Sequence, residues 1–353
     1  MKNLISACIL IFIFSGIVHH FTDLPVYAGL DPSKKIYTED SCGDQEKYTE
    51  IRTRLEDLRV KLNIPGMSSA IVKNGEIVWA EGSGYADINN KIPFTADTPY
   101  RLASLTKTFA STIIMQLVEA GKIDLDDPIS EYGISFGNKS IKVRHLLTHT
   151  SGDPPGERYK YDGNRFSYLG AVIMHVTEKS FNKLLDEQII KSLGLKNTGA
   201  DLSELSVKPA VPYETDKNGR LIRSIYPGRF SVSAGLFSSA VDIAKYNIAI
   251  DSNQFVSMKT QDLIFSPTIS HSGRKLPYGL GWFTQQIGDK HIVWHYGYFP
   301  PSVSTLIIKI PEDKLTFILL ANSENLSKSF NLGMGDVTNS PAAKIFLETF
   351  GYD

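Results

Sequence analysis

The segment around which this chain is organised reads Arg101-Leu102-Ala103-Ser104-Leu105-Thr106-Lys107-Thr108-Phe109. Residues 110–120 continue it as a largely apolar run that ends at Gly121, a pattern that predicts a buried helix with a glycine stop. Ser104 and Lys107 fall in the first turn of this predicted helix, and residues three apart share a helix face. The Lys107 amine can therefore approach the Ser104 hydroxyl.

A hydroxyl and an amine in this relation are the two groups that nucleophilic catalysis by serine needs. The hydroxyl becomes a strong nucleophile when a base takes its proton, and lysine acts as that base when burial or a neighbouring cation lowers its pKa. Free N–H groups and the positive dipole end at the helix start also stabilise an oxyanion. The alternative is that Ser104 caps the helix and Lys107 is solvated, because Ser-x-x-Lys alone is a weak signal.

Length and composition are those of an ordinary globular protein. The 353 residues are 42% hydrophobic and carry a formal net charge of -1, which suits one large domain or two lobes. No long basic run with interleaved aromatic residues is present, so we expect no nucleic-acid partner. The two cysteines are Cys8 and Cys42, and we expect no internal disulfide in the mature chain.

The first 28 residues have the pattern of an export signal. Residues 4–18 form an apolar run that is too short for a comfortable membrane span, and Val26-Tyr27-Ala28 places small residues at a cleavage site. We expect cleavage after Ala28, a secreted or periplasmic protein without a stable membrane span, and a linker at residues 29–44. An uncleaved N-terminal anchor is the alternative.

The residues that follow predict an α+β fold. An amphipathic helix at residues 48–62 and a hairpin across Asn74-Gly75 precede the Ser104 helix. Further helices are predicted at residues 166–176, 181–193, 240–250 and 341–350, and strands at residues 280–287, 291–295, 303–310 and 315–321. Residues 201–230 give no clear pattern.

This order of elements indicates one domain at residues 45–353. We expect its two ends to share one antiparallel sheet flanked by helices. Residues 104–235 would form an all-helical lobe inserted in the α/β lobe, with Ser104 at their junction.

Two histidines have a spacing that metal sites use. His145 and His149 lie four residues apart, as two ligands on one helix do. Leu146 occupies the position where a zinc protease carries its glutamate, and no third ligand is evident. We interpret both histidines as structural and expect neither a metal nor another cofactor.

Four separated motifs occur in a fixed order. They are Ser104-Leu105-Thr106-Lys107, then Leu146-Leu147-Thr148-His149-Thr150-Ser151-Gly152, then Tyr161-Asp162-Gly163 followed by Phe166-Ser167-Tyr168-Leu169-Gly170, and last His295-Tyr296-Gly297. Together they resemble the serine hydrolases related to class C β-lactamases, D-alanyl-D-alanine carboxypeptidases and esterases. The resemblance covers residues 45–321 and implies a β-lactamase/transpeptidase-like fold.

The resemblance also implies catalytic roles. Ser104 resembles the acylated nucleophile of that family, and Lys107 resembles its activating partner. Tyr161 resembles the tyrosine that passes protons to the leaving group and activates the deacylating water, although the base of each step is disputed among such enzymes. The backbone N–H groups of Ser104 and Tyr298 would form the oxyanion hole.

The fourth motif implies substrate contacts. His295, with Gly297 two residues later, would line the cleft on an edge strand, where its ring could orient Tyr161 or meet a substrate carboxylate. The alternative is a strand histidine whose ring nitrogens are satisfied by the protein itself. A histidine in place of lysine is more like the peptidase and esterase branches than like dedicated β-lactamases.

The third motif departs from the family pattern. Counted back from Gly170, Gly163 occupies the position of the family's asparagine, so an amide that normally contacts the lysine and the substrate is missing. Asn164 could replace it if the loop shifts, and Tyr159 is a rival for the role of Tyr161. We therefore expect short-chain esters to be hydrolysed faster than β-lactams.

These patterns predict an exported serine acyl hydrolase with a small-molecule or peptide substrate. D-amino-acid peptides, as for a penicillin-binding carboxypeptidase, and small esters are the expected substrate classes, and β-lactam hydrolysis is a further alternative. An α/β-hydrolase would need Gly-x-Ser-x-Gly after a strand, which we do not find. From a different class, the alternative is a non-catalytic module that binds or traps cell-wall peptide or β-lactam.

Overall fold

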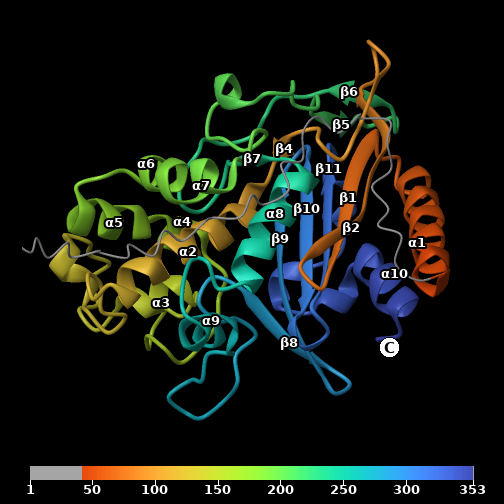
Figure 1. Ribbon diagram of the computed structural model, residues 1–353. Helices are drawn as coiled ribbons and strands as arrows, with labels where there is room; N and C mark the ends of the chain where they lie inside the picture. Colours follow the sequence, from red (N-terminus) through yellow and green to blue (C-terminus); the bar gives the residue numbers. More distant parts are fainter. Residues whose placement is uncertain (1–41, 353) are drawn as a thin grey trace, which may run out of the picture. The chain divides into compact units, whose positions relative to one another are not determined.

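The computed structural model describes residues 42–352 (Figure 1). The chain divides into two units after Lys34, and all described residues belong to the second unit. The predicted signal peptide, its cleavage site at Ala28, most of the predicted linker and Cys8 lie outside the described residues. Within residues 42–352, no helix combines the length and the apolar character needed to cross a membrane.

An antiparallel sheet of seven strands forms the centre of the second unit, in the order β3-β2-β1-β11-β10-β9-β8. The strands are β1 (Gly66–Lys73), β2 (Glu76–Asp87), β3 (Ile92–Pro93), β8 (Phe283–Ile287), β9 (Lys290–Phe299), β10 (Val303–Ile310) and β11 (Leu315–Ala321). Because β1 pairs with β11, the early hairpin and the late strands share one sheet, as the sequence predicted.

The hairpin of β1 and β2 shows why Asn-Gly was informative. Asn74 and Gly75 both have positive φ, at 53° and 81°. A two-residue hairpin turn with that backbone matches the right-handed twist of its strands, and asparagine and glycine adopt it with little strain. The predicted turn is confirmed.

The two faces of the sheet carry two separate apolar cores. On one face pack α1 (Cys42–Lys61) and α10 (Pro341–Phe350), with Phe317 and Phe346 in the core between them and the sheet. On the other face pack α2 (Thr106–Glu119) and α8 (Ala240–Asp251), where Phe109 and Ile318 are buried (Figure 1). Neighbouring residues of β11 thus face opposite cores, as strand geometry requires.

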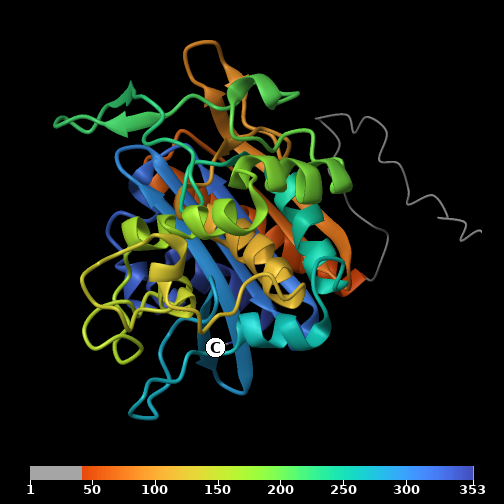
Figure 2. The same ribbon diagram turned by 90° about the vertical axis from the view of Figure 1, so that its left-hand side faces the viewer.

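The segment between β3 and β8 is mainly helical, and Figure 2 shows its yellow and green parts in front of the sheet. Its further helices are α3 (Val143–Leu147), α4 (Gly163–Ser167), α5 (Leu169–Thr177), α6 (Phe181–Leu185), α7 (Lys191–Leu193) and α9 (Met258–Phe265), with a π-helical segment at Asp186–Ile190. The helices predicted at residues 166–176 and 181–193 are present as shorter pieces.

Two features of the segment between β3 and β8 differ from the prediction. It is not wholly helical, because the unassigned residues contain a small hairpin of β5 (Tyr213–Thr215) and β6 (Leu221–Arg223). Helix α9 was not predicted.

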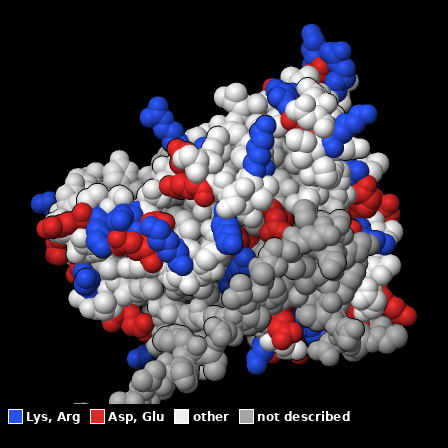
Figure 3. Space-filling model, turned by 45° about the horizontal axis from the view of Figure 1, so that its top comes forward, with Lys and Arg blue, Asp and Glu red and all other residues white. Residues whose placement is uncertain are grey.

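On the surface shown in Figure 3, acidic and basic side chains lie among one another, in keeping with the formal net charge of -1.

Candidate active site

Ser104 lies on a single 3-10 turn, Ala103–Leu105, that leads directly into α2. The helix itself begins at Thr106, so Ser104 lies just before the first turn in which it was predicted. Ala103 has a φ of 46°, a left-handed conformation that costs a non-glycine residue about 1–3 kcal/mol. Such strain persists only where the surrounding structure holds the backbone firmly.

Contacts with two other segments hold this turn in place. The N–H of Leu102 donates to the carbonyl of Leu236 at 2.8 Å, and the Thr305 hydroxyl donates to the carbonyl of Leu102 at 2.9 Å. A Cβ added at Gly297 would lie 2.0 Å from the same Leu102 oxygen. Only glycine therefore lets β9 pass this close to the Ser104 turn, which accounts for the glycine of the fourth motif.

Lys107 is buried beside Ser104. Its Nζ donates to Ser104 Oγ at 3.1 Å and to the carbonyl of Ser233 at 2.7 Å, and the side chain is only 1% exposed. Burial lowers the pKa of this amine to about 7, against the opposing effect of the Asp162 carboxylate. A large fraction of Lys107 is then neutral near pH 7 and can accept the serine proton.

Tyr161 also reaches this centre. The Lys107 Nζ lies 5.2 Å from the centre of the Tyr161 ring. Burial, together with neighbouring Tyr296, raises the pKa of Tyr161, and the Ser104 hydroxyl opposes that rise. The Tyr161 hydroxyl is buried without a hydrogen-bond partner of good geometry in the described part of the chain. A protonated hydroxyl that is free to exchange partners suits a proton relay.

The rival Tyr159 points elsewhere. Its hydroxyl donates to the carbonyl of Gly333 at 3.0 Å. The geometry therefore brings Tyr161, and not Tyr159, to the Ser104–Lys107 pair.

His149 of the second motif forms hydrogen bonds with both neighbours of Tyr161. Its Nδ1 accepts the N–H of Asp162 at 3.1 Å, and its carbonyl accepts the N–H of Lys160 at 2.9 Å. Its ring centre lies 4.2 Å from that of Tyr161. Burial, with Lys107 and His295 nearby, holds the pKa of His149 well below its usual range.

From the sequence we expected His149 to be a structural residue and did not connect it with Tyr161. The available signal was that both residues belong to motifs of one family. His145, four residues earlier, accepts the N–H of Lys142 through Nδ1 at 3.1 Å. Among residues 42–352, no group of three or more histidine, cysteine or acidic side chains is placed to hold a metal ion.

His295 differs from the expectation in its strand position and in its contacts. Strand β9 is not an edge strand, because β8 lies outside it, although their pairing stops at Trp294. The His295 ring is fully buried. Its Nδ1 lies 2.7 Å from the carbonyl of Tyr296 and its Nε2 lies 2.8 Å from the hydroxyl of Tyr278.

These contacts fix the protonation of His295. A carbonyl only accepts hydrogen bonds, so Nδ1 carries the proton and Nε2 accepts from Tyr278. Burial and the charge of Lys107 lower the pKa of His295 to about 3. A neutral ring with both nitrogens satisfied is poorly suited to meet a substrate carboxylate, so the geometry favours the alternative of a self-satisfied strand histidine.

Tyr298 remains the candidate for the second oxyanion-hole donor. It follows Gly297, where β9 passes the Ser104 turn, and it pairs with Ser304 of β10. Its hydroxyl donates to Glu324 Oε2 at 3.2 Å. The role of its backbone N–H in an oxyanion hole stays a prediction.

A family model described as Beta-lactamase matches residues 51–333 of this chain. The chain belongs to the β-lactamase family. Members of this family that share the fold are serine hydrolases, and all four sequence motifs lie within the matched residues.

Individual relatives of this β-lactamase-family chain are distant. Protein flp of Staphylococcus aureus (strain MW2) is 26% identical over 319 residues, with 78% of this chain and 63% of flp covered. The chain thus spans less than two thirds of that relative. A solved octameric penicillin-binding protein homologue from Pyrococcus abyssi has a TM-score of 0.76 at 26% identity, covering 87% of this chain and 78% of its own.

A second solved structure shows the same fold at lower identity. D-amino acid amidase from Ochrobactrum anthropi SV3, complexed with D-phenylalanine, has a TM-score of 0.68 at 22% identity, covering 86% of this chain and 99% of its own. These neighbours confirm the expected β-lactamase/transpeptidase-like fold.

Within this family the departure at Gly163 now has a location. A Cβ added at Gly163 would lie 3.6 Å from Lys107 Nζ, so this position faces the amine. Asn164 is exposed on α4, and the hydrogen bonds of Lys107 in the described structure go to Ser104 and Ser233. Asn164 therefore does not take the place of a side chain at position 163.

Proposed function

We propose that this member of the β-lactamase family is an exported serine acyl hydrolase that forms an acyl-enzyme on Ser104. The observation that carries the proposal is the buried Lys107 amine, whose pKa of about 7 and distance of 3.1 Å from Ser104 Oγ suit it as the activating base. The proposed chemistry and the proposed export rest on different observations. Export rests on the N-terminal sequence pattern alone.

Acylation would proceed in three linked transfers. Neutral Lys107 takes the Ser104 proton as Oγ attacks the substrate carbonyl carbon. The N–H groups of Ser104 and Tyr298 donate to the oxyanion that forms. When the carbon–leaving-group bond breaks, the leaving group receives a proton through the Tyr161 hydroxyl, which Lys107 reprotonates.

Deacylation uses the same groups in reverse. Water gives a proton to neutral Lys107, directly or through the Tyr161 hydroxyl, which passes its own proton on to Lys107, as the water oxygen attacks the ester carbonyl of the acyl-enzyme. The bond from carbon to Ser104 Oγ then breaks, and the oxygen recovers its proton from the Lys107 ammonium. The acid product leaves and the enzyme returns to its starting state.

The proposed substrates are D-amino-acid peptides and small esters. The position of Gly163 supports a preference between simple esters and β-lactams, because glycine at this position places no side-chain amide beside Lys107 that could bind an acylamide side chain. A missing hydrogen bond to the acylamide group weakens binding by roughly 0.5–1.5 kcal/mol net. Simple esters have no acylamide group and are not affected. We therefore propose that short-chain esters are turned over faster than β-lactams.

A fluorescent acylating probe tests the mechanism. The purified chain is mixed with the probe and followed by intact-mass spectrometry and gel fluorescence. A single acyl mass on Ser104 that disappears with time supports hydrolysis, whereas a lasting label indicates a trapped binder. Ser104→Ala should remove the label, and a label on Ser151 of the second motif would refute the assignment.

A substrate panel tests the substrate class. A nitrophenyl ester, a D-alanyl-D-alanine peptide and a chromogenic cephalosporin are compared by kcat/KM, for the parent chain and for Gly163→Asn. We expect the variant to narrow the gap between ester and β-lactam by about two- to tenfold. Efficient cephalosporin hydrolysis by the parent chain would contradict the proposed preference.

A further inference from the structure

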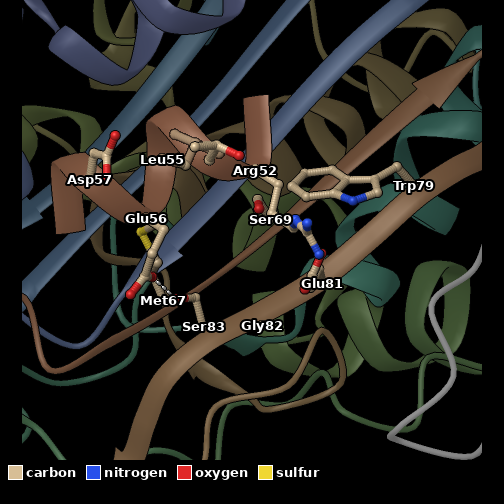
Figure 4. Close-up of a pocket in the computed structure, with 11 residues that line it drawn as sticks. Arg52, Leu55, Glu56, Asp57, Met67, Ser69, Trp79, Glu81, Gly82 and Ser83 are labelled. Carbon is tan, nitrogen blue, oxygen red and sulfur yellow. Dashed lines mark hydrogen bonds between the residues drawn. The ribbon is translucent and has the colours of Figure 1, made fainter. Parts of the chain in front are cut away.

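A cavity of about 380 Å³ lies on the sheet face opposite the Ser104 core, between α1 and the strands β1 and β2 (Figure 4). Ligand-binding pockets start near this volume. Its walls come from the N-terminal helix and hairpin, and no residue of the proposed catalytic centre lines it.

Two buried polar atoms at this cavity have no hydrogen-bond partner in the described residues. They are the indole N–H of Trp79, whose side chain is only 2% exposed, and Oε2 of Glu81. The two residues lie two apart on β2, so their side chains share one face of the sheet. A donor and an acceptor on one face of β2 are thus left unpaired, which costs free energy unless something in the cavity pairs with them.

Trp294 provides a comparison for Trp79 that tests whether the cavity matters. Trp294 also has a buried indole N–H without a partner in the described part of the chain. It does not line this cavity, so a ligand here would not reach it. Trp294 therefore serves as a matched control.

Charged groups around these two atoms have opposite signs. Figure 4 shows Arg52 reaching from α1 toward Glu81 across the cavity. Glu56 is already occupied, because Arg59 donates to it at 2.6 Å and the Ser83 hydroxyl also donates to it. Asp57, which is exposed, and Ser69 also line the cavity. Around the two unpaired atoms, the groups open to an occupant are the Arg52 guanidinium and the Trp79 N–H as donors, and the Glu81 carboxylate as acceptor.

This set is complementary to a small zwitterion. Guanidinium and indole N–H groups suit a carboxylate, and a carboxylate suits an ammonium group. Leu55 and Met67 supply an apolar wall in the same cavity. We propose that the cavity binds a free α-amino acid with an apolar side chain, its carboxylate on Arg52 and Trp79 and its ammonium on Glu81.

The amino-acid site is independent of the proposed hydrolase activity, and its test is designed to show this. Isothermal titration calorimetry uses the full chain carrying Ser104→Ala, so no turnover contributes heat. D-leucine and L-leucine are the probes, and saturable 1:1 binding of either supports the site. Isocaproate, which lacks the amine, and leucinamide, which lacks the carboxylate, should each bind about tenfold or more weakly.

Variants then locate the binding. Trp79→Phe keeps a ring and removes the N–H, and Glu81→Gln keeps the shape and removes the charge. Each should weaken leucine binding about tenfold or more, while Trp294→Phe leaves the dissociation constant unchanged. Thermal unfolding verifies that all three variants are folded.

Three results would overturn the proposal. The first is absence of saturable heat with millimolar leucine. The second is binding of isocaproate or leucinamide as tight as that of leucine. The third is an affinity insensitive to both Trp79→Phe and Glu81→Gln, which would place the amino acid elsewhere, including the Ser104 cleft.

Discussion

Burial of Lys107 has opposite effects on catalysis and on stability. It lowers the pKa of the amine to about 7, which provides a neutral base near physiological pH. In the unfolded chain the amine returns to its usual pKa of about 10.4. Between these two values the unfolded state binds more protons, so this residue makes folding stability rise with pH from about 7 upward. Below pH 7 its destabilising effect is fully present.

The pH profile of acylation tests the role of Lys107. We expect kcat/KM for a short ester to rise about tenfold per unit below pH 7 and to level off above it, as the base loses its proton. Lys107→Met should abolish the reaction and raise the free energy of unfolding more at pH 6 than at pH 10. Stopped-flow assays and denaturant titrations measure both. A profile that is flat from pH 6 to 8 would exclude this base.

Tyr161 and Tyr159 offer a matched pair of substitutions. Tyr161→Phe removes the hydroxyl beside Ser104, so turnover should fall by about 10²- to 10⁴-fold, the usual contribution of a positioned acid or base. Tyr159→Phe removes a hydrogen bond to Gly333 and should leave turnover nearly unchanged. Steady-state kinetics on an ester decides between them. The reverse pattern would show that the loop register has been misassigned.

Sequence reasoning reached the residues whose relation is local and missed those that depend on distant partners. Ser104 and Lys107 are three residues apart, so their contact follows from helical geometry. The satisfied ring of His295 depends on Tyr278, which is 17 residues away. Position 163 faces Lys107 although 56 residues separate the two, a relation that helical periodicity does not predict. Family spacing, and not periodicity, located Gly163 beforehand.

At the level of elements, the loop from the second motif to α4 is held by hydrogen bonds to His149. His149 has a φ of 55° and accepts the N–H of Asp162 through its ring. Asparagine adopts such a left-handed backbone more readily than most residues, and its Oδ1 can replace Nδ1 as an acceptor. Alanine provides neither property.

Substitution of His149 separates a positioning role from simple packing. His149→Ala should lower kcat by about 10²-fold or more with little change in KM, because the Tyr161 loop loses its anchor. His149→Asn should recover most of that loss, although it too removes the ring that contacts Tyr161. Kinetics and melting temperatures are measured for both. Equal kcat values for the two variants would argue against the acceptor as the anchor.

Element prediction succeeded where local signals were complete. β10, β11 and α10 have the predicted bounds, and the helix predicted at residues 240–250 is α8, capped by Ser239, whose hydroxyl accepts the N–H of Asp242 at 3.2 Å. The helix predicted at residues 166–176 is divided into α4 and α5, and α5 ends at Thr177, where Glu178 adopts a φ of 57°. Helix α9 was missed because its apolar residues gather at one end instead of recurring with helical period.

At the scale of the whole molecule, the sheet separates two cores with different consequences for the site. Phe109 follows Lys107 on α2 and stacks on Tyr246 at 3.9 Å between ring centres, in the core that adjoins Ser104. Phe346 of α10 stacks on Phe317 at 5.0 Å, in the core of the opposite face. Phe109 and Phe346 are both fully buried. Substituting each in turn therefore shows how packing on either side of the sheet affects stability and activity.

Truncating each phenylalanine should therefore separate the two properties. Phe346→Ala and Phe109→Ala should each cost about 3–5 kcal/mol of unfolding free energy, the usual effect of emptying a buried phenylalanine site. At a temperature where both variants remain folded, Phe346→Ala should acylate at nearly the parent rate, because the contacts that hold the Ser104 turn come from Leu236 and Thr305. Phe109→Ala should acylate more slowly, because the space left by the missing ring adjoins α2, the helix that carries Lys107. Denaturant titration and single-turnover acylation measure the two effects, and equal slowing in both variants would mean that the sheet transmits packing changes from one face to the other.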